Sequence, residues 1–122
     1  MVDSVLIICE DGPFGKNSVV ESIRMAAGLL AVGDIEVCKV LLLKDAIYFL
    51  KKNLDPKALK TDDFANIIKL IELSELHLYI HNEALELAGL EYNDLILQKY
   101  LKIVNNKEIS QLILNADMSF KY

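Results

Sequence analysis

The chain has 122 residues, of which 53% are hydrophobic, and its 13 Lys and Arg against 18 Asp and Glu give a formal net charge of -5. This length fits one domain, and the apolar content excludes an intrinsically disordered chain. Two cysteines are too few for a disulfide scaffold, and the acidic balance with a single arginine argues against a nucleic-acid-binding protein.

Short apolar runs alternate with helical periodicity along the chain, which predicts an α/β domain. The nearly continuous apolar run Ser4–Cys9 predicts a first strand covered on both faces. A helix from Val19 to Val32, a strand over Glu36–Leu43 and a short helix over Ala46–Lys52 follow. Another helix begins near Thr61, where a threonine precedes two aspartates.

The second half of the chain continues the alternation of strands and helices. The elements predicted there are a strand over His77–Ile80, a helix over Glu83–Ala88, a strand over Lys102–Val104, a helix from Asn105 or Asn106 to Leu114 and a strand over Asp117–Phe120. We therefore expect residues 1–122 to form a single domain with a five-stranded, mainly parallel sheet and helices on both faces. Ligands of such sheets bind at the carboxyl ends of the strands.

The loop after the first strand is the most distinctive local motif. It reads Asp11-Gly12-Pro13-Phe14-Gly15-Lys16 and leads to the start of a helix, where backbone N–H groups favour anions. It lacks the glycine spacing of a Walker A loop and of a dinucleotide-binding loop, so a nucleotide-binding module is only a third hypothesis. A plain tight turn and a ligand-binding loop both remain open.

The cysteines and histidines offer few candidate reactive groups. Cys9 lies at the carboxyl end of the first strand and is a weak candidate nucleophile, whereas Cys38 lies inside a strand and is expected to be structural. His77 and His81 bracket a strand, about 13 Å apart, so no metal site is predicted. His81 alone is a candidate ligand-binding residue, with a surface or capping histidine as the alternative.

The mean hydropathy of +0.30 is high for a chain without a long apolar segment. Its longest apolar runs, such as Val5–Cys9 and Val40–Leu43, are far shorter than the roughly 20 residues of a membrane-spanning helix. The first residues lack the basic start of a signal peptide. We expect a cytoplasmic protein, with no membrane partner, that buries apolar surface in subunit contacts.

Four segments of the sequence together resemble the DsrE/DsrF-like family of sulfur-relay proteins, most closely its DsrF/TusC branch. The segments are Asp-Gly-Pro-Phe-Gly after the first strand, Leu-Lys-Asp-Ala-Ile-Tyr-Phe-Leu, Leu-Tyr-Ile-His-Asn-Glu-Ala-Leu-Glu-Leu-Ala-Gly-Leu and Asn-Ala-Asp-Met-Ser-Phe. The resemblance covers roughly residues 3–120. It implies a five-stranded α/β domain that assembles with related subunits as a homo- or hetero-oligomer, a trimer or hexamer. We expect no cofactor.

The resemblance also implies where a sulfur carrier would have its cysteine. Some members carry sulfur as a persulfide on a cysteine after the third strand, and counting back from Ala88-Gly89-Leu90 that position here is His81. A histidine cannot form a persulfide. We therefore expect a non-carrier subunit of a sulfur-relay oligomer, without independent catalytic activity. The alternative is a small-ligand or persulfide-handling protein that uses Cys9 and the Gly12–Lys16 loop, with Lys16 as the local positive charge.

Overall fold

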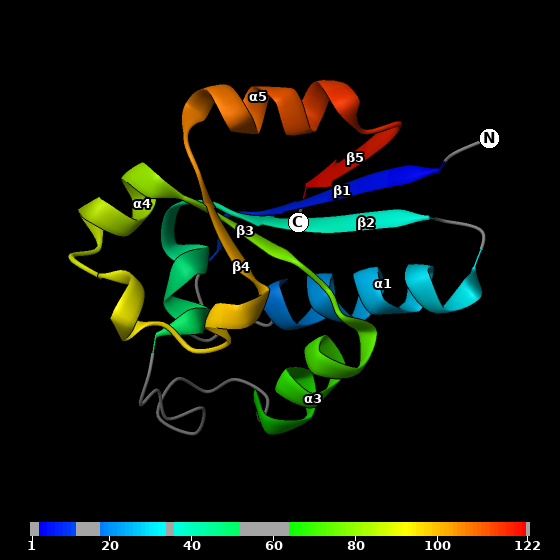
Figure 1. Ribbon diagram of the computed structural model, residues 1–122, viewed down its shortest axis with the longest axis horizontal. Coiled ribbons are helices and arrows are strands. Elements are labelled where there is room, and N and C mark those ends of the chain that lie inside the picture. The colour runs from blue at the N-terminus through cyan, green and yellow to red at the C-terminus, as the bar shows by residue number, and fades with distance from the viewer. Residues whose placement is uncertain (1–2, 12–17, 34–35, 52–63, 122) are drawn as a thin grey trace.

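The protein is described by a computed structural model that covers residues 3–11, 18–33, 36–51 and 64–121 (Figure 1). The five strands form one sheet in the order β4-β3-β2-β1-β5, and all four neighbouring pairs are parallel. The strands are β1 (Ser4–Cys9), β2 (Val37–Leu42), β3 (Leu78–His81), β4 (Leu101–Val104) and β5 (Met118–Lys121). The prediction of a five-stranded parallel sheet is confirmed.

Helices cover both faces of this sheet, as predicted. Figure 1 shows α1 (Ser18–Val32) and α3 (Phe64–Ser74) on one face and α5 (Asn106–Asn115) on the other. The 3₁₀ helix η1 (Lys44–Leu50) follows β2, and α4 (Asn82–Leu87) follows β3. Two short 3₁₀ turns, η2 (Tyr92–Asp94) and η3 (Gln98–Tyr100), fill the stretch before β4.

The alternation of side chains across β1 explains its continuous apolar sequence. Val5, Ile7 and Cys9 point into the larger core beneath α1 and α3. Leu6 belongs to a smaller core on the opposite face, where Ile109 of α5 packs against it. A parallel strand buried on both faces must be apolar at every position, because neither face meets water.

The boundaries of several elements differ from the predicted ones by one or two residues. The second helix expected over Ala46–Lys52 is the 3₁₀ helix η1, which begins at Lys44, a residue with a positive φ of 50°. The strand β3 extends to His81 rather than ending at Ile80. Asn105 is the N-cap of α5, because its side chain accepts a hydrogen bond from the Glu108 backbone N–H. The predicted helix start at Thr61 lies outside the described residues.

Candidate functional site at the carboxyl edge of the sheet

Because all the strands are parallel, the residues that follow them meet along one edge of the sheet. An ion-pair network joins three strand ends there. The Glu10 carboxylate, just after β1, lies 3.1 Å from Lys44 Nζ after β2 and 3.2 Å from Lys121 Nζ in β5. The network ties strands that are distant in sequence into one polar edge.

Glu10 is the anionic centre of this network. Hydrogen bonds from Lys44 and then Lys121 lower the pKa of the Glu10 carboxyl below its ordinary value. The Lys44 backbone is held in the left-handed region, with a φ of 50°. Such a conformation is unfavourable for a residue with a Cβ, and it turns the chain from β2 into η1 while aiming the Lys44 side chain at Glu10.

His81, at the end of β3, is held by a chain of side-chain hydrogen bonds. Asn106 Nδ2 donates to Glu83 Oε1 at 3.0 Å, and Asn106 Oδ1 lies 2.7 Å from His81 Nε2. The carboxylate can only accept, so the amide nitrogen faces Glu83 and the amide oxygen faces His81. His81 Nε2 therefore carries a hydrogen, and Nδ1 is the acceptor of the neutral ring.

The histidine side chain is held but still accessible. It is 17% exposed, and Glu83 Oε2 lies 3.9 Å from its Nε2. His81 is also the residue before α4, yet no side-chain cap bond from it is formed there. Within the described part of the chain, His81 Nδ1 has no hydrogen-bond partner. This nitrogen is a hydrogen-bond acceptor at the edge of the sheet.

Cys9 is placed at the same edge, but its thiol faces inward. The residue is 0% exposed, and its Sγ–H donates to the Asp11 carbonyl oxygen at a long 3.8 Å. Burial raises the pKa of the Cys9 thiol, and a side-chain hydrogen bond with Ser22 offsets the rise only in part. The thiol is therefore protonated at neutral pH, which makes it a poor nucleophile.

Cys38 and His77 lie toward the opposite, amino edge of the sheet. Both line a cavity of about 300 Å³ that also includes Lys39 and Tyr79, and Cys38 is 5% exposed. Burial raises the pKa of the Cys38 thiol to about 11. His77 precedes β3 while His81 ends it, so the two histidines are not brought together. No group of three potential metal ligands occurs among the residues that the structure describes.

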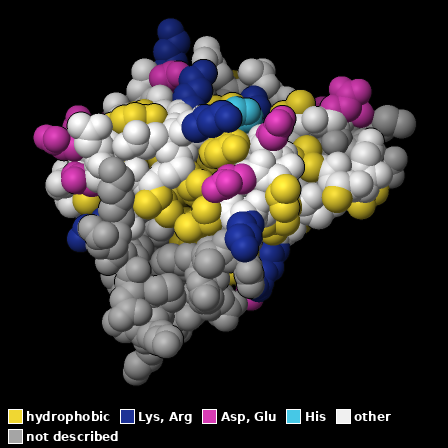
Figure 2. Space-filling view, turned by 60° about the horizontal axis from the view of Figure 1, so that its bottom comes forward, with side chains coloured by type: hydrophobic (Ala, Val, Ile, Leu, Met, Phe, Trp, Pro, Cys, Tyr) yellow, Lys and Arg dark blue, Asp and Glu magenta, His cyan; other side chains and the backbone are white. Residues whose placement is uncertain are grey.

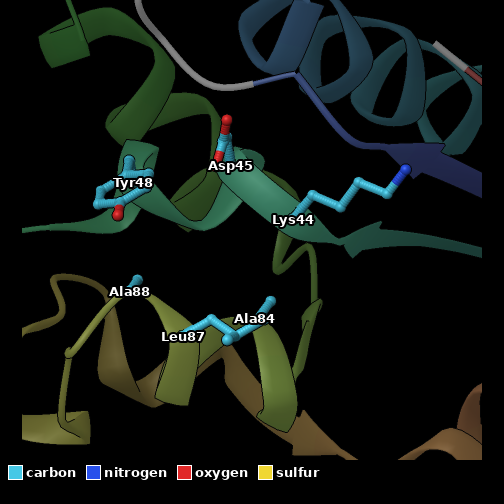
Figure 3. A pocket seen from close by; sticks show the side chains of 6 residues that line it. All are labelled: Lys44, Asp45, Tyr48, Ala84, Leu87 and Ala88. Carbon is cyan, nitrogen blue, oxygen red and sulfur yellow. The ribbon is translucent and has the colours of Figure 1, made fainter.

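A cavity of about 340 Å³ opens at the carboxyl edge between η1 and α4. Figure 3 shows Lys44, Asp45 and Tyr48 of η1 on one side. Its opposite wall consists of Ala84, Leu87 and Ala88 of α4. The volume lies at the lower end of the range of about 300–1,000 Å³ for small-molecule sites. The lining combines apolar side chains of α4 with an ammonium, a carboxylate and a phenol from η1, which suits a small molecule with both apolar and polar groups.

Only part of the predicted ligand site can be placed in the structure. Cys9, Asp11 and His81 all lie at the carboxyl edge, and Asp11 is half-buried. His81 is not among the described residues that line the cavity beside α4. The remaining predicted ligand residues, Gly12, Phe14, Gly15 and Lys16, lie outside the described residues.

Sequence reasoning missed the partners of His81. Asn106 was predicted only as one of two possible helix caps, and Glu83 only as the start of a helix. The available signal was topological: residues after neighbouring parallel strands meet, and β3 and β4 are neighbours in the sheet. Since Asn105 takes the capping role, the side chain of Asn106 remains available for His81.

The charged side chains do not gather into a patch of one sign on the face shown in Figure 2. Lys and Arg side chains are interspersed there with Asp and Glu, and hydrophobic side chains lie between them. A nucleic-acid-binding surface requires concentrated positive charge. In the described part of the chain, no helix has the length and apolar character needed to cross a bilayer.

The fold defined above is shared with solved α/β proteins. The crystal structure of YchN from E. coli matches with a TM-score of 0.78 and 17% identity, over 98% of this chain and 99% of that one. The protein of unknown function MTH1491 from Methanobacterium thermoautotrophicum matches with a TM-score of 0.66 and 13% identity, over 98% and 100%. At these identities the likeness shows the fold alone. No curated protein sequence matches the chain.

The chain therefore has the fold of a small α/β protein such as YchN. The sequence identifies the family. The profile of the DsrE/DsrF-like family matches residues 3–121, which is nearly the whole chain. The chain belongs to the DsrE/DsrF-like family.

Proposed function

We propose that this protein is a non-carrier subunit of a sulfur-relay oligomer of the DsrF/TusC kind. It supports intracellular sulfur transfer by its partners and has no independent catalytic activity. Membership of the DsrE/DsrF-like family supports the general role. The free state of both cysteines, Cys9 and Cys38, fits the reducing cytoplasm in which we place the protein.

The observation that carries the proposal is the absence of a usable thiol where a carrier would need one. His81 occupies the end of β3, the position that the resemblance assigns to the carrier cysteine. Cys9 and Cys38 are both buried, and both have raised thiol pKa values. A persulfide carrier needs an accessible thiolate to take up and pass on sulfur, and neither cysteine supplies it.

His81 still gives this edge a chemical role in an assembly. Its Nδ1 can accept a hydrogen bond or proton from a thiol of a neighbouring subunit, while Asn106 holds Nε2–H. A thiol that loses its proton becomes the nucleophilic thiolate. We therefore infer that the subunit assists a partner's cysteine rather than carrying sulfur itself.

A small-ligand-binding protein is the second candidate function. The cavity between η1 and α4 favours it, because its volume of about 340 Å³ can hold a small molecule at the edge where α/β sheets bind ligands. A reactive form of this function would use Cys9 and the Gly12–Lys16 loop. The buried, protonated thiol of Cys9 makes that reactive form the weaker one. Persulfide trapping on the wild type and Cys9→Ser tests it, since equal labelling or none rejects a role for Cys9.

Size-exclusion chromatography and native mass spectrometry test the main proposal. The protein should form a trimer or hexamer, alone or with family members that have the carrier cysteine. Persulfide trapping on such a complex should label the partner and leave this chain unlabelled. A stable monomer that binds none of those family members would contradict the proposal.

A further inference from the structure

The strand β5 forms one edge of the sheet, and its residues are more exposed to solvent than those of any other strand. All four of its residues are exposed, whereas β4 at the opposite edge includes the buried Val104. An edge strand presents unpaired backbone N–H and C=O groups, which makes it a template for another strand. Natural proteins usually protect such edges with charges, prolines or covering loops.

Two apolar side chains of β5 extend the main hydrophobic face of the sheet. Met118 and Phe120 are in register with Val5 and Ile7 of β1, whose side chains are buried in the core beneath α1. Met118 is nevertheless 43% exposed and Phe120 37% exposed. The apolar layer under the sheet thus continues past β1 without anything covering it among the described residues.

We propose that β5 pairs antiparallel with β5 of a second copy of this chain, around a two-fold axis at Ser119. A two-fold contact uses the same patch on both subunits, so the strand must be complementary to itself. In this register, Met118 lies opposite Phe120 of the partner copy, and the same contact occurs twice. A thioether beside an aromatic ring is a favourable cross-strand pair.

The charges at the ends of β5 select this register. With Ser119 on the axis, Lys121 lies opposite Asp117 of the partner copy, so each end of the contact brings opposite charges together. If Phe120 lay on the axis instead, Lys121 would face Ser119, and with Met118 on the axis Asp117 would face Ser119. Of these three registers, only the Ser119-centred one pairs both Lys121 and Asp117, the residue before the strand, with an opposite charge.

Within one copy, both charged groups contact residues on the β1 side of β5, so the pairing across the axis would be an additional contact for each. Asp117 Oδ2 accepts hydrogen bonds from the backbone N–H groups of Asp3 and Ser4, at 2.9 and 3.1 Å. Lys121 Nζ lies 3.2 Å from Glu10, and its side chain is 65% exposed, so further donors of its ammonium group remain accessible. The two five-stranded sheets would become one continuous sheet, with both apolar layers joined across the axis. This contact does not depend on the sulfur-relay role.

A disulfide across the axis tests the register directly. Opposed residues in antiparallel strands have Cα atoms about 4.5–5.5 Å apart, within the range of a disulfide. Ser119→Cys should form a disulfide-linked dimer under mild oxidation. The two native cysteines are buried and should not compete for this disulfide. Leu114→Cys is the control, because Leu114 is 82% exposed and belongs to α5 rather than to the paired strand. Cross-linking of Ser119→Cys no greater than that of the control would overturn the proposal.

A pair of lysine substitutions distinguishes the two edges of the sheet. Phe120→Lys should weaken self-association about tenfold, because it removes two cross-strand pairs in each dimer. Ile103→Lys in β4, at a residue with the same 37% exposure, should leave association unchanged. Analytical ultracentrifugation measures both, with circular dichroism to show that each variant is folded. If Ile103→Lys dissociates the protein and Phe120→Lys does not, the β5 contact is wrong, whereas the relay role would stand.

Discussion

The two cysteines should be almost unreactive toward thiol reagents in the folded protein. Only the thiolate reacts, and a pKa of about 11 for Cys38 leaves about one molecule in 10⁴ ionised at pH 7. At the ordinary value of 9.0 the fraction would be about one in 10². The loss of thiolate alone therefore predicts a reaction about 100-fold slower. Exposures of 5% for Cys38 and 0% for Cys9 slow it further, because the reagent needs local opening to reach the sulfur.

The rates can be assigned with an aromatic disulfide reagent and two single variants. Cys9→Ala reports on Cys38 alone, and Cys38→Ala on Cys9 alone. Each thiol should react at the rate of a small free thiol once the chain is unfolded in guanidinium. A native-state reaction of either cysteine at that unfolded rate would refute the burial argument and with it the assignment of a non-carrier role.

Two further predictions concern the carboxyl edge. Asn106→Ala should lower stability by about 1 kcal/mol, because two side-chain hydrogen bonds are lost, and imidazole nitrogen chemical shifts should show that His81 no longer keeps its proton on Nε2. Asn105→Ala is the matched control: it should cost about 1 kcal/mol through the lost helix cap yet leave the His81 tautomer unchanged. An unchanged tautomer in both variants would disprove the positioning role of Asn106. Glu10→Gln should destabilise the protein by less than about 1 kcal/mol at pH 7, and the difference from wild type should vanish as the pH falls. Folding lowers the pKa of Glu10. The ionised carboxylate therefore stabilises the protein fully above the pKa of the unfolded state, and this stabilisation is lost as the pH falls through the pKa of the folded state. Urea unfolding from pH 7 to pH 3 measures this difference, and one that does not change with pH would contradict the ion-pair assignment.

The strand and helix pattern could be predicted because each element carries its signal locally. The run Ser4–Cys9 is apolar at nearly every position, and the structure buries it between two helix layers. The α5 helix has a cap at Asn105 and apolar residues at Ile109 and Leu112. The 3₁₀ form of η1 was not predicted, because hydrophobic spacing over seven residues does not distinguish a 3₁₀ helix from an α-helix.

The sequence predicted the location of the site, the carboxyl edge of the sheet, but not the contacts between its residues. Those contacts depend on the order of the strands in the sheet. Cys9 and His81 were expected there, since both end strands. The contact of His81 with Asn106 needs β3 beside β4, and that of Glu10 with Lys121 needs β1 beside β5. Local sequence patterns do not determine which strands are neighbours in the sheet. The inward direction of the Cys9 thiol likewise depends on which face α1 covers.

Persulfide uptake measured by mass spectrometry tests the central claim most directly. The native protein is incubated with a polysulfide, trapped with an alkylating reagent and compared with the variant His81→Cys, which restores a cysteine at the end of β3. We expect no added sulfur on the wild type and one added sulfur on the introduced cysteine of the variant. Added sulfur on Cys9 or Cys38 of the folded wild type would contradict the non-carrier role.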